Sequence, residues 1–96
     1  MRPNYKNSEA KIQREISRWK MGDLLAIKEQ VALENEKQLV EYLKKNSRCL
    51  FLGEIKEKYA LASKFWVKVT NGKKIGWIPA RFVRLITQNK RKPENE

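Results

Sequence analysis

The residues of this chain that could do chemistry are mainly cationic and aromatic. Glutamate pairs occur at 34/36 and 54/57, but a solvated helix or strand edge explains them better than a catalytic dyad. The chain has no histidine, one aspartate (Asp23) and one cysteine (Cys49). Catalytic triads, histidine acid–base pairs and ordinary zinc sites cannot be assembled from this set. The four glycines stand apart, so no glycine-rich phosphate loop is present. We therefore expect a protein that is not an enzyme, needs no cofactor or metal, and has no small-molecule substrate.

The positive charge of the chain is concentrated in its C-terminal third. The net charge is +11 over 96 residues. Residues 58–93 contain ten basic residues and no acidic residue, whereas residues 24–57 contain six of each. A long block of one sign on a folded element is typical of a surface that binds nucleic acid or anionic lipid. A basic surface that serves only solubility stays open as the alternative.

The chain carries no sequence signal for a membrane or for secretion. No apolar run approaches the roughly 18 residues that span a bilayer, and the N-terminus MRPNYKNSEAK has no apolar segment of a signal peptide. Cys49 lies in the apolar run CLFL, which predicts a small buried side chain in a reducing compartment. We therefore expect a cytoplasmic protein that does not contact a membrane.

Hydrophobic periodicity divides the chain into a flexible arm (1–7), one compact domain (8–86) and a disordered basic tail (87–96). The predicted elements of the domain are a helix over 9–20, a strand over 24–31, a second helix over 33–45 and a β-rich segment over 48–86. Ser8 is placed as the N-cap of the first helix and Gly22 as its C-cap. The expected fold class is α+β, a small antiparallel β-barrel with one or two amphipathic helices in the N-terminal half.

The segment FWVKVTNGKKIGWIP predicts a β-hairpin. Asn71-Gly72 is typical of a two-residue type I′ turn, in which both central residues have positive φ. That turn predicts a register in which Trp66 faces Trp77 across the strands.

Alternation along the two strands then sorts the side chains onto two faces. The predicted core face consists of Phe65, Val67, Val69 and Ile78. The predicted outer face consists of Trp66, Lys68, Ile75 and Trp77. Two hypotheses stay open for the outer face: an aromatic binding platform flanked by lysine, or a surface covered by one of the predicted helices.

The C-terminal part of this segment resembles the Src-homology-3 (SH3) domain. GWIPARFVRLI is similar to the two last strands and the intervening 3₁₀ turn of that family, and the spacing from Trp66 to Gly76 matches as well. The resemblance covers residues 65–86 well and 19–30 (within WKMGDLLAIKEQ) loosely. It implies an SH3-like barrel in which Trp66, Pro79 and Phe82 line a groove for proline-rich peptides. Unlike the family's acidic loop, the stretch KIQREISRWK is basic.

The charge and the resemblance together predict a non-enzymatic nucleic-acid-binding protein, an accessory or regulatory factor with weak sequence preference for DNA or RNA. The predicted contact residues are Trp66, Lys68, Lys73, Lys74, Trp77, Pro79, Arg81, Phe82 and Arg84, with tail contacts from Lys90, Arg91 and Lys92. The alternative function is a protein–protein interaction module of SH3 type that binds a non-standard acidic or apolar peptide or protein partner.

Overall fold

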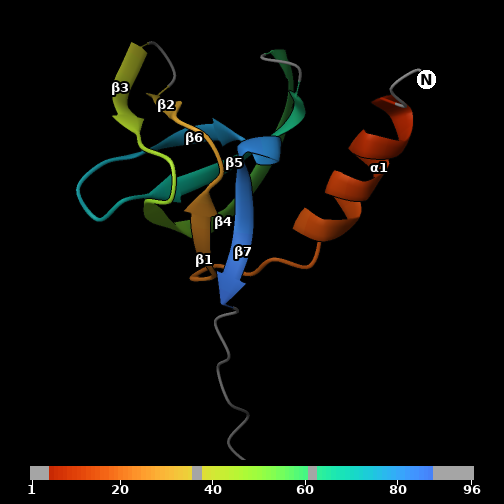
Figure 1. Ribbon diagram of the computed structural model, residues 1–96, viewed down its shortest axis with the longest axis horizontal. Coiled ribbons are helices and arrows are strands. Elements are labelled where there is room, and N and C mark those ends of the chain that lie inside the picture. The colour runs from red at the N-terminus through yellow and green to blue at the C-terminus, as the bar shows by residue number, and fades with distance from the viewer. Residues whose placement is uncertain (1–4, 36–37, 61–62, 88–96) are drawn as a thin grey trace, which may run out of the picture.

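Most of the described residues lie in β-strands, and burial alternates along several of these strands. The computed structural model describes residues 5–35, 38–60 and 63–87. Its elements in chain order are α1 (Tyr5–Ile16), β1 (Leu24–Ile27), β2 (Val31–Asn35), β3 (Gln38–Leu43), β4 (Arg48–Ala60), β5 (Ser63–Thr70), β6 (Ile75–Pro79), the 3₁₀ helix η1 (Ala80–Phe82) and β7 (Val83–Thr87) (Figure 1). The described part of the chain is therefore mostly β with one α-helix.

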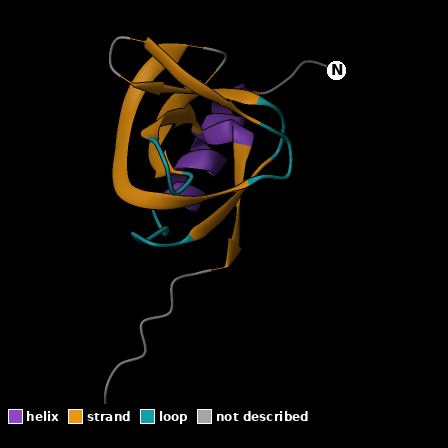
Figure 2. Ribbon diagram, turned by 90° about the vertical axis from the view of Figure 1, so that its left-hand side faces the viewer, coloured by secondary structure: helices purple, strands orange, loops and turns teal. Residues whose placement is uncertain are grey.

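The strands form one antiparallel sheet of seven strands in the order β3-β2-β6-β5-β4-β1-β7, which curls into a half-barrel (Figures 1 and 2). Curling depends on β4, which spans 13 residues and pairs with β1 near its start and with β5 along its length. The register of β4 against β5 shifts between Phe51 and Ile55, where Gly53 has a φ of +87°. A glycine tolerates this positive φ, so the strand bends there and serves both parts of the sheet.

The sheet closes further where β2 approaches β6. Glu34 of β2 pairs with Trp77 of β6, next to Gly76. A Cβ atom added at Gly76 would lie 2.7 Å from the Glu34 carbonyl oxygen and 2.8 Å from Leu33 Cγ. Only glycine allows the two backbones to come this close.

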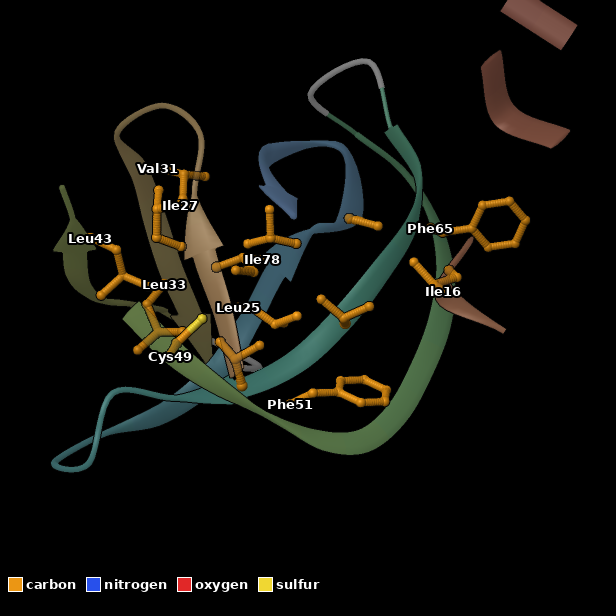
Figure 3. Close-up of a cluster of buried hydrophobic side chains, with 14 residues drawn as sticks. Ile16, Leu25, Ile27, Val31, Leu33, Leu43, Cys49, Phe51, Phe65 and Ile78 are labelled. Carbon is orange, nitrogen blue, oxygen red and sulfur yellow. The ribbon is translucent and has the colours of Figure 1, made fainter. Parts of the chain in front are cut away.

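The core lies inside the curl of the sheet (Figure 3). Leu25 and Phe51 lie in its middle, Leu33 and Leu43 at one end, and Ile16 beside Phe65 at the other. The predicted core face of the hairpin is confirmed, because its four members are buried. Ile16 is the residue through which α1 enters this core, with Ile12 packed against it as a partly buried neighbour.

The first helix forms, but its bounds differ from the prediction of 9–20. Helix α1 runs from Tyr5 to Ile16, so part of the predicted arm is helical, while residues 1–4 lie outside the described residues. After Ile16 the chain forms a 3₁₀-type turn, in which the Arg18 and Trp19 amides donate to the carbonyls three residues before them. Trp19 then packs edge-on against Phe51, with ring centroids 5.8 Å apart. The helix therefore ends four residues earlier than predicted, and Trp19 contacts the core from the turn that follows it.

The prediction of a second helix over 33–45 is wrong. The segment forms strands β2 and β3, a hairpin that pairs with β6. Glu, Lys and Leu favour a helix here, but burial in β2 alternates, with Val31 and Leu33 inside and Ala32 and Glu34 less buried. β2 pairs with β3 along its length and with β6 at Glu34, and this pairing overrides the local helix propensity.

Two other boundaries change. The predicted strand over 24–31 is broken by a turn at residues 28–30, so that Val31 already belongs to β2. Thr87 of the predicted tail is the last residue of β7, and the rest of the tail lies outside the described residues. The β-rich segment over 48–86 is confirmed by β4 to β7, apart from residues 61–62, which the structure does not describe.

Candidate functional site

The hairpin of β5 and β6 forms with a register two residues away from the predicted one. Trp66 pairs with Pro79 and Lys68 with Trp77, so the turn comprises four residues, 71–74. A type I′ turn needs positive φ at both central residues. Gly72 has a φ of +97°, but Asn71 is not among the described residues with positive φ. Because the shift is by two residues, each side chain still lies on its predicted face of the hairpin.

Trp66 is fully buried and cannot contact a ligand in this structure. It has 0% of its surface exposed, although it lies on the face of β5 opposite Val67. Its indole Nε1 donates to the Lys58 carbonyl at 2.8 Å, and the Lys58 Nζ lies 4.5 Å from the ring centroid. Lys58 is also held by an ion pair to Glu34 at 3.3 Å. The β4 strand therefore covers the tryptophan that the sequence places in a binding platform.

The rest of the predicted platform is engaged in internal contacts. Trp77 is half-buried, and the Lys56 Nζ lies 4.2 Å from its ring centroid. Lys68, paired with Trp77 across the strands, forms an ion pair with Glu54 at 3.1 Å. Cation–π contacts and surface ion pairs of this kind contribute about 0.5–1 kcal/mol each. This Trp–Lys face, composed of Lys56, Lys58, Trp66, Lys68 and Trp77, therefore has its lysines occupied by aromatic rings and carboxylates.

Pro79, Arg81, Phe82 and Arg84 do not join the Trp–Lys face in one open site. Pro79 is buried between β6 and η1. Arg81, Phe82 and Arg84 line cavities between α1 and the segment formed by η1 and β7. The structure thus divides the predicted site among three places, and Lys90, Arg91 and Lys92 lie outside the described residues.

Lys73 and Lys74 lie at a third place, where a second turn meets the hairpin tip. The turn that joins β3 to β4 lies at the same end of the sheet as the turn of residues 71–74 (Figure 1). Two contacts define this neighbourhood: Leu50 pairs with Thr70, and the Asn71 Nδ2 donates to Glu41 Oε2 at 2.9 Å. The cations that gather here, which we call the basic end, are Lys44, Lys45, Arg48, Lys73 and Lys74. All five are exposed, and none forms an ion pair with a described residue.

Hydrogen bonds hold the backbone of the hairpin turn. The Asn71 Oδ1 accepts from the amides of Lys73 and Lys74, each at 2.9 Å. The Thr70 hydroxyl donates to the Lys74 carbonyl at 2.8 Å and accepts from the Gly72 amide at 3.0 Å. Short asparagine and threonine side chains stabilise turns in this way. Lys73 and Lys74 therefore project from a defined backbone.

The second turn is tied to β1. The Asn46 amide donates to the Ile27 carbonyl at 2.7 Å, and the Ile27 amide donates to the Ser47 carbonyl at 2.9 Å. Asn46 has a φ of 71°, a conformation that asparagine tolerates better than most residues. The Ser47 hydroxyl donates to the Lys44 carbonyl at 2.6 Å. Both turns of the basic end thus present lysine and arginine from an ordered backbone.

Lys44, Lys45 and Arg48 were missed by the sequence prediction, because a helix over 33–45 assigns the two lysines to a helix C-terminus. The signal that could have found them is Asn46-Ser47, which is typical of a turn between strands. Their proximity to Lys73 is a tertiary effect, since about 25 residues of chain separate the two turns.

Chemistry other than charge is sparse in the described part of the chain. The Cys49 side chain is 2% exposed, as predicted, and burial raises the pKa of its thiol to about 12, so it is no nucleophile near neutral pH. No group of three or more described residues could hold a metal ion. Nor is any described helix long and apolar enough to cross a membrane.

The chain was compared with protein-family models, curated proteins and solved structures, and none of them matches it.

Proposed function

We propose that this protein binds nucleic acid without catalysis, and that the basic end is its main contact with the phosphate backbone. The observation that carries the proposal is the gathering of five exposed cations on two ordered turns, with no ion pair to a described residue. The Glu41 carboxylate nearby already accepts a hydrogen bond from Asn71. Unpaired lysine and arginine release counterions from nucleic acid when they neutralise phosphates, and this supplies most of non-specific affinity.

The stacking role predicted for Trp66 and Trp77 is not part of this proposal. Base stacking requires an accessible aromatic face. Trp66 has none, and Lys56 lies over the ring of Trp77. The binding we infer is electrostatic, and for that reason it discriminates weakly between sequences.

We further infer that the half-barrel is of SH3 type. Two features support this: β6, η1 and β7 follow one another over GWIPARFVRLI as the family resemblance implies, and β2 with β3 forms a hairpin between the first strand and the long β4. A proline-peptide groove does not follow from this fold. The groove's tryptophan is buried under Lys58, which Glu34 holds in place by an ion pair.

The test is a fluorescence-polarisation titration of labelled 20-nucleotide single and double strands between 50 and 200 mM NaCl. Five phosphate contacts predict a slope of log affinity against log salt of about −4.5 for duplex and about −3.5 for single strands. The double variant Lys73→Gln/Lys74→Gln should reduce the duplex slope by about 2.

The matched control is Lys11→Gln/Lys20→Gln, which removes the same charge from exposed positions away from the basic end. We expect it to change the slope far less than the hairpin variant. Binding that is absent at 50 mM NaCl, or equal losses in the two variants, would contradict a specific role for the basic end.

A further inference from the structure

A groove is lined by α1, by the segment of η1 and β7, and by Lys28 and Glu29, which follow β1. In Figure 1, α1 lies on the side of β7 away from β1. The groove consists of two cavities of about 440 and 480 Å³. Glu15 and Lys28 line both cavities, so the two adjoin. None of the five residues of the basic end lines this groove, and the groove has no part in the function proposed above.

One wall of the groove is the free edge of the sheet. β7 is the last strand in the sheet order, and β1 is its one neighbour among the described strands. Val83, Arg84 and Leu85 all line the groove, although successive side chains of a strand point to opposite faces. A cavity touched by three successive residues lies along the edge of the strand. Backbone amides and carbonyls that β1 does not use point toward such an edge.

The opposite wall comes from the end of α1 and the turn after it, where Arg18 and Trp19 line the groove. Trp19 is fixed by its edge-on contact with Phe51. The groove therefore has an apolar side, made by Trp19 with Val83 and Leu85, that continues into the core. The other side is polar and carries Arg84, which is exposed.

Positive charge dominates the groove. The side chains of Lys11, Arg18, Lys28 and Arg84 line it and have no hydrogen bond or ion pair with a described residue. Arg81 pairs with Glu9 at 3.4 Å, yet its buried Nε has no hydrogen-bond partner. A ligand with carboxylates would neutralise these cations.

We propose that this groove binds an extended acidic segment of a partner protein, which adds to the sheet as a strand beside β7. Main-chain hydrogen bonds to the edge would supply affinity, and alternate side chains would supply specificity. Because one side of the groove is apolar and the other cationic, the segment alternates apolar with acidic residues. Nucleic acid fits less well, since it offers no backbone for strand pairing, and Glu15 and Glu29 in the walls repel a continuous row of phosphates.

The experiment uses the full chain, labelled with ¹⁵N, and an acetylated eight-residue peptide that alternates glutamate and valine. We expect peptide binding to shift the amide signals of β7 and of Trp19. A peptide N-methylated at all of its backbone nitrogens keeps the charge but cannot donate any strand hydrogen bond, so it should bind at least about tenfold more weakly. A lysine–valine peptide should not bind.

Two charge reversals make the test specific. Arg84→Glu should weaken binding of the glutamate–valine peptide by at least about tenfold, because it places a carboxylate beside the ligand. Lys73→Glu makes the same change in net charge at the basic end, in the turn between β5 and β6, and should leave peptide affinity within about twofold, since exposed charges separated by more than a Debye length are screened. Both residues are exposed, and the unperturbed amide spectrum of each variant verifies its fold.

Three results would overturn the proposal: no peptide binding at millimolar concentration, equal binding of the N-methylated peptide, or equal losses in the two variants. A fourth is a 20-nucleotide strand that displaces the peptide and shifts the same β7 amides, which would assign the groove to nucleic acid. If salt-dependent oligonucleotide binding is lost only in Lys73→Gln/Lys74→Gln, the proposed function of the basic end is supported. That result does not test the groove, which the peptide titrations test separately.

Discussion

At the residue scale, the position of Trp66 depends on one lysine. Lys58 accepts the indole hydrogen bond with its carbonyl and lies over the ring with its ammonium group. The register of β4 against β5 shifts between Glu57 and Ala60, and Lys58 lies within this irregular stretch. The Lys58 ammonium can thus lie over the ring and reach the Glu34 carboxylate at the same time. A large aromatic on the outer face of the sheet is in this way removed from solvent.

We predict that Trp66 stabilises the fold and does not contact nucleic acid. Trp66→Phe leaves the Lys58 carbonyl without its donor and opens a cavity, so the free energy of unfolding in urea should fall by about 1–3 kcal/mol. Oligonucleotide affinity of the folded variant should be unchanged. Trp77→Phe, at a half-buried position, is the control and should cost less. If Trp66→Phe had wild-type stability and weaker oligonucleotide binding, Trp66 would belong to the nucleic-acid interface.

At the scale of elements, the approach of β2 to β6 explains why residues 31–43 form strands and not a helix. Glu34 pairs with Trp77, and Leu33 fills the space above Gly76. Without this contact, the hairpin of β2 and β3 would have no sheet to extend, and its residues favour a helix when taken alone. The absent side chain at Gly76 therefore permits the close approach of β2 to β6. Through the pairing of β2 with β3, this approach also positions the second turn of the basic end, with Lys44 and Lys45.

We predict that Gly76→Ala destabilises the protein by about 1–3 kcal/mol, because its methyl group would press on backbone and a buried leucine. Chemical denaturation measures the change. Gly72 is the matched control: it has a φ of +97° but no atom within 4 Å of an added Cβ. Gly72→Asn should therefore be nearly neutral, since asparagine tolerates that φ. Equal stability of Gly76→Ala and wild type would show that the two strands lie further apart.

At the scale of the whole molecule, the net charge of +11 destabilises the folded state through repulsion between like charges. Like charges repel more strongly in the compact form than in the unfolded chain. The basic end concentrates this repulsion, because two turns from distant parts of the chain bring four lysines and Arg48 together. Salt screens this repulsion, and anions that bind to the folded state neutralise it, so both should stabilise the fold.

We predict that the melting temperature rises when NaCl is increased from 50 to 500 mM, by about 4–8 °C for a gain near 1 kcal/mol. The variant Lys44→Gln/Lys45→Gln/Lys73→Gln/Lys74→Gln should show a smaller rise, because it removes most of the local repulsion. Calorimetry at both salt concentrations gives the comparison. A melting temperature that is independent of salt in the wild type would mean that the cations are too far apart to interact.

The sequence predicted the features that depend on near neighbours. Period-two alternation over residues 65–78 sorted Phe65, Val67 and Val69 to the core, and they are buried. The register at Asn71-Gly72 was wrong because two side chains, Thr70 and Asn71, build a four-residue turn with their own hydrogen bonds. The helix over 33–45 was wrong because this segment forms the hairpin of β2 and β3, which joins the sheet through Glu34 and Trp77, more than 40 residues apart along the chain.

Composition by itself determined which side chains the chain has: no histidine, one aspartate and one cysteine, and many cations and aromatics. Only the tertiary structure decided which of these are available. It buried Trp66 under Lys58, paired Lys68 with Glu54, and gathered unpaired cations from two turns that a local pattern treats separately. The physical reason is that charge and side-chain type belong to each residue, whereas exposure and pairing depend on contacts between strands far apart in sequence.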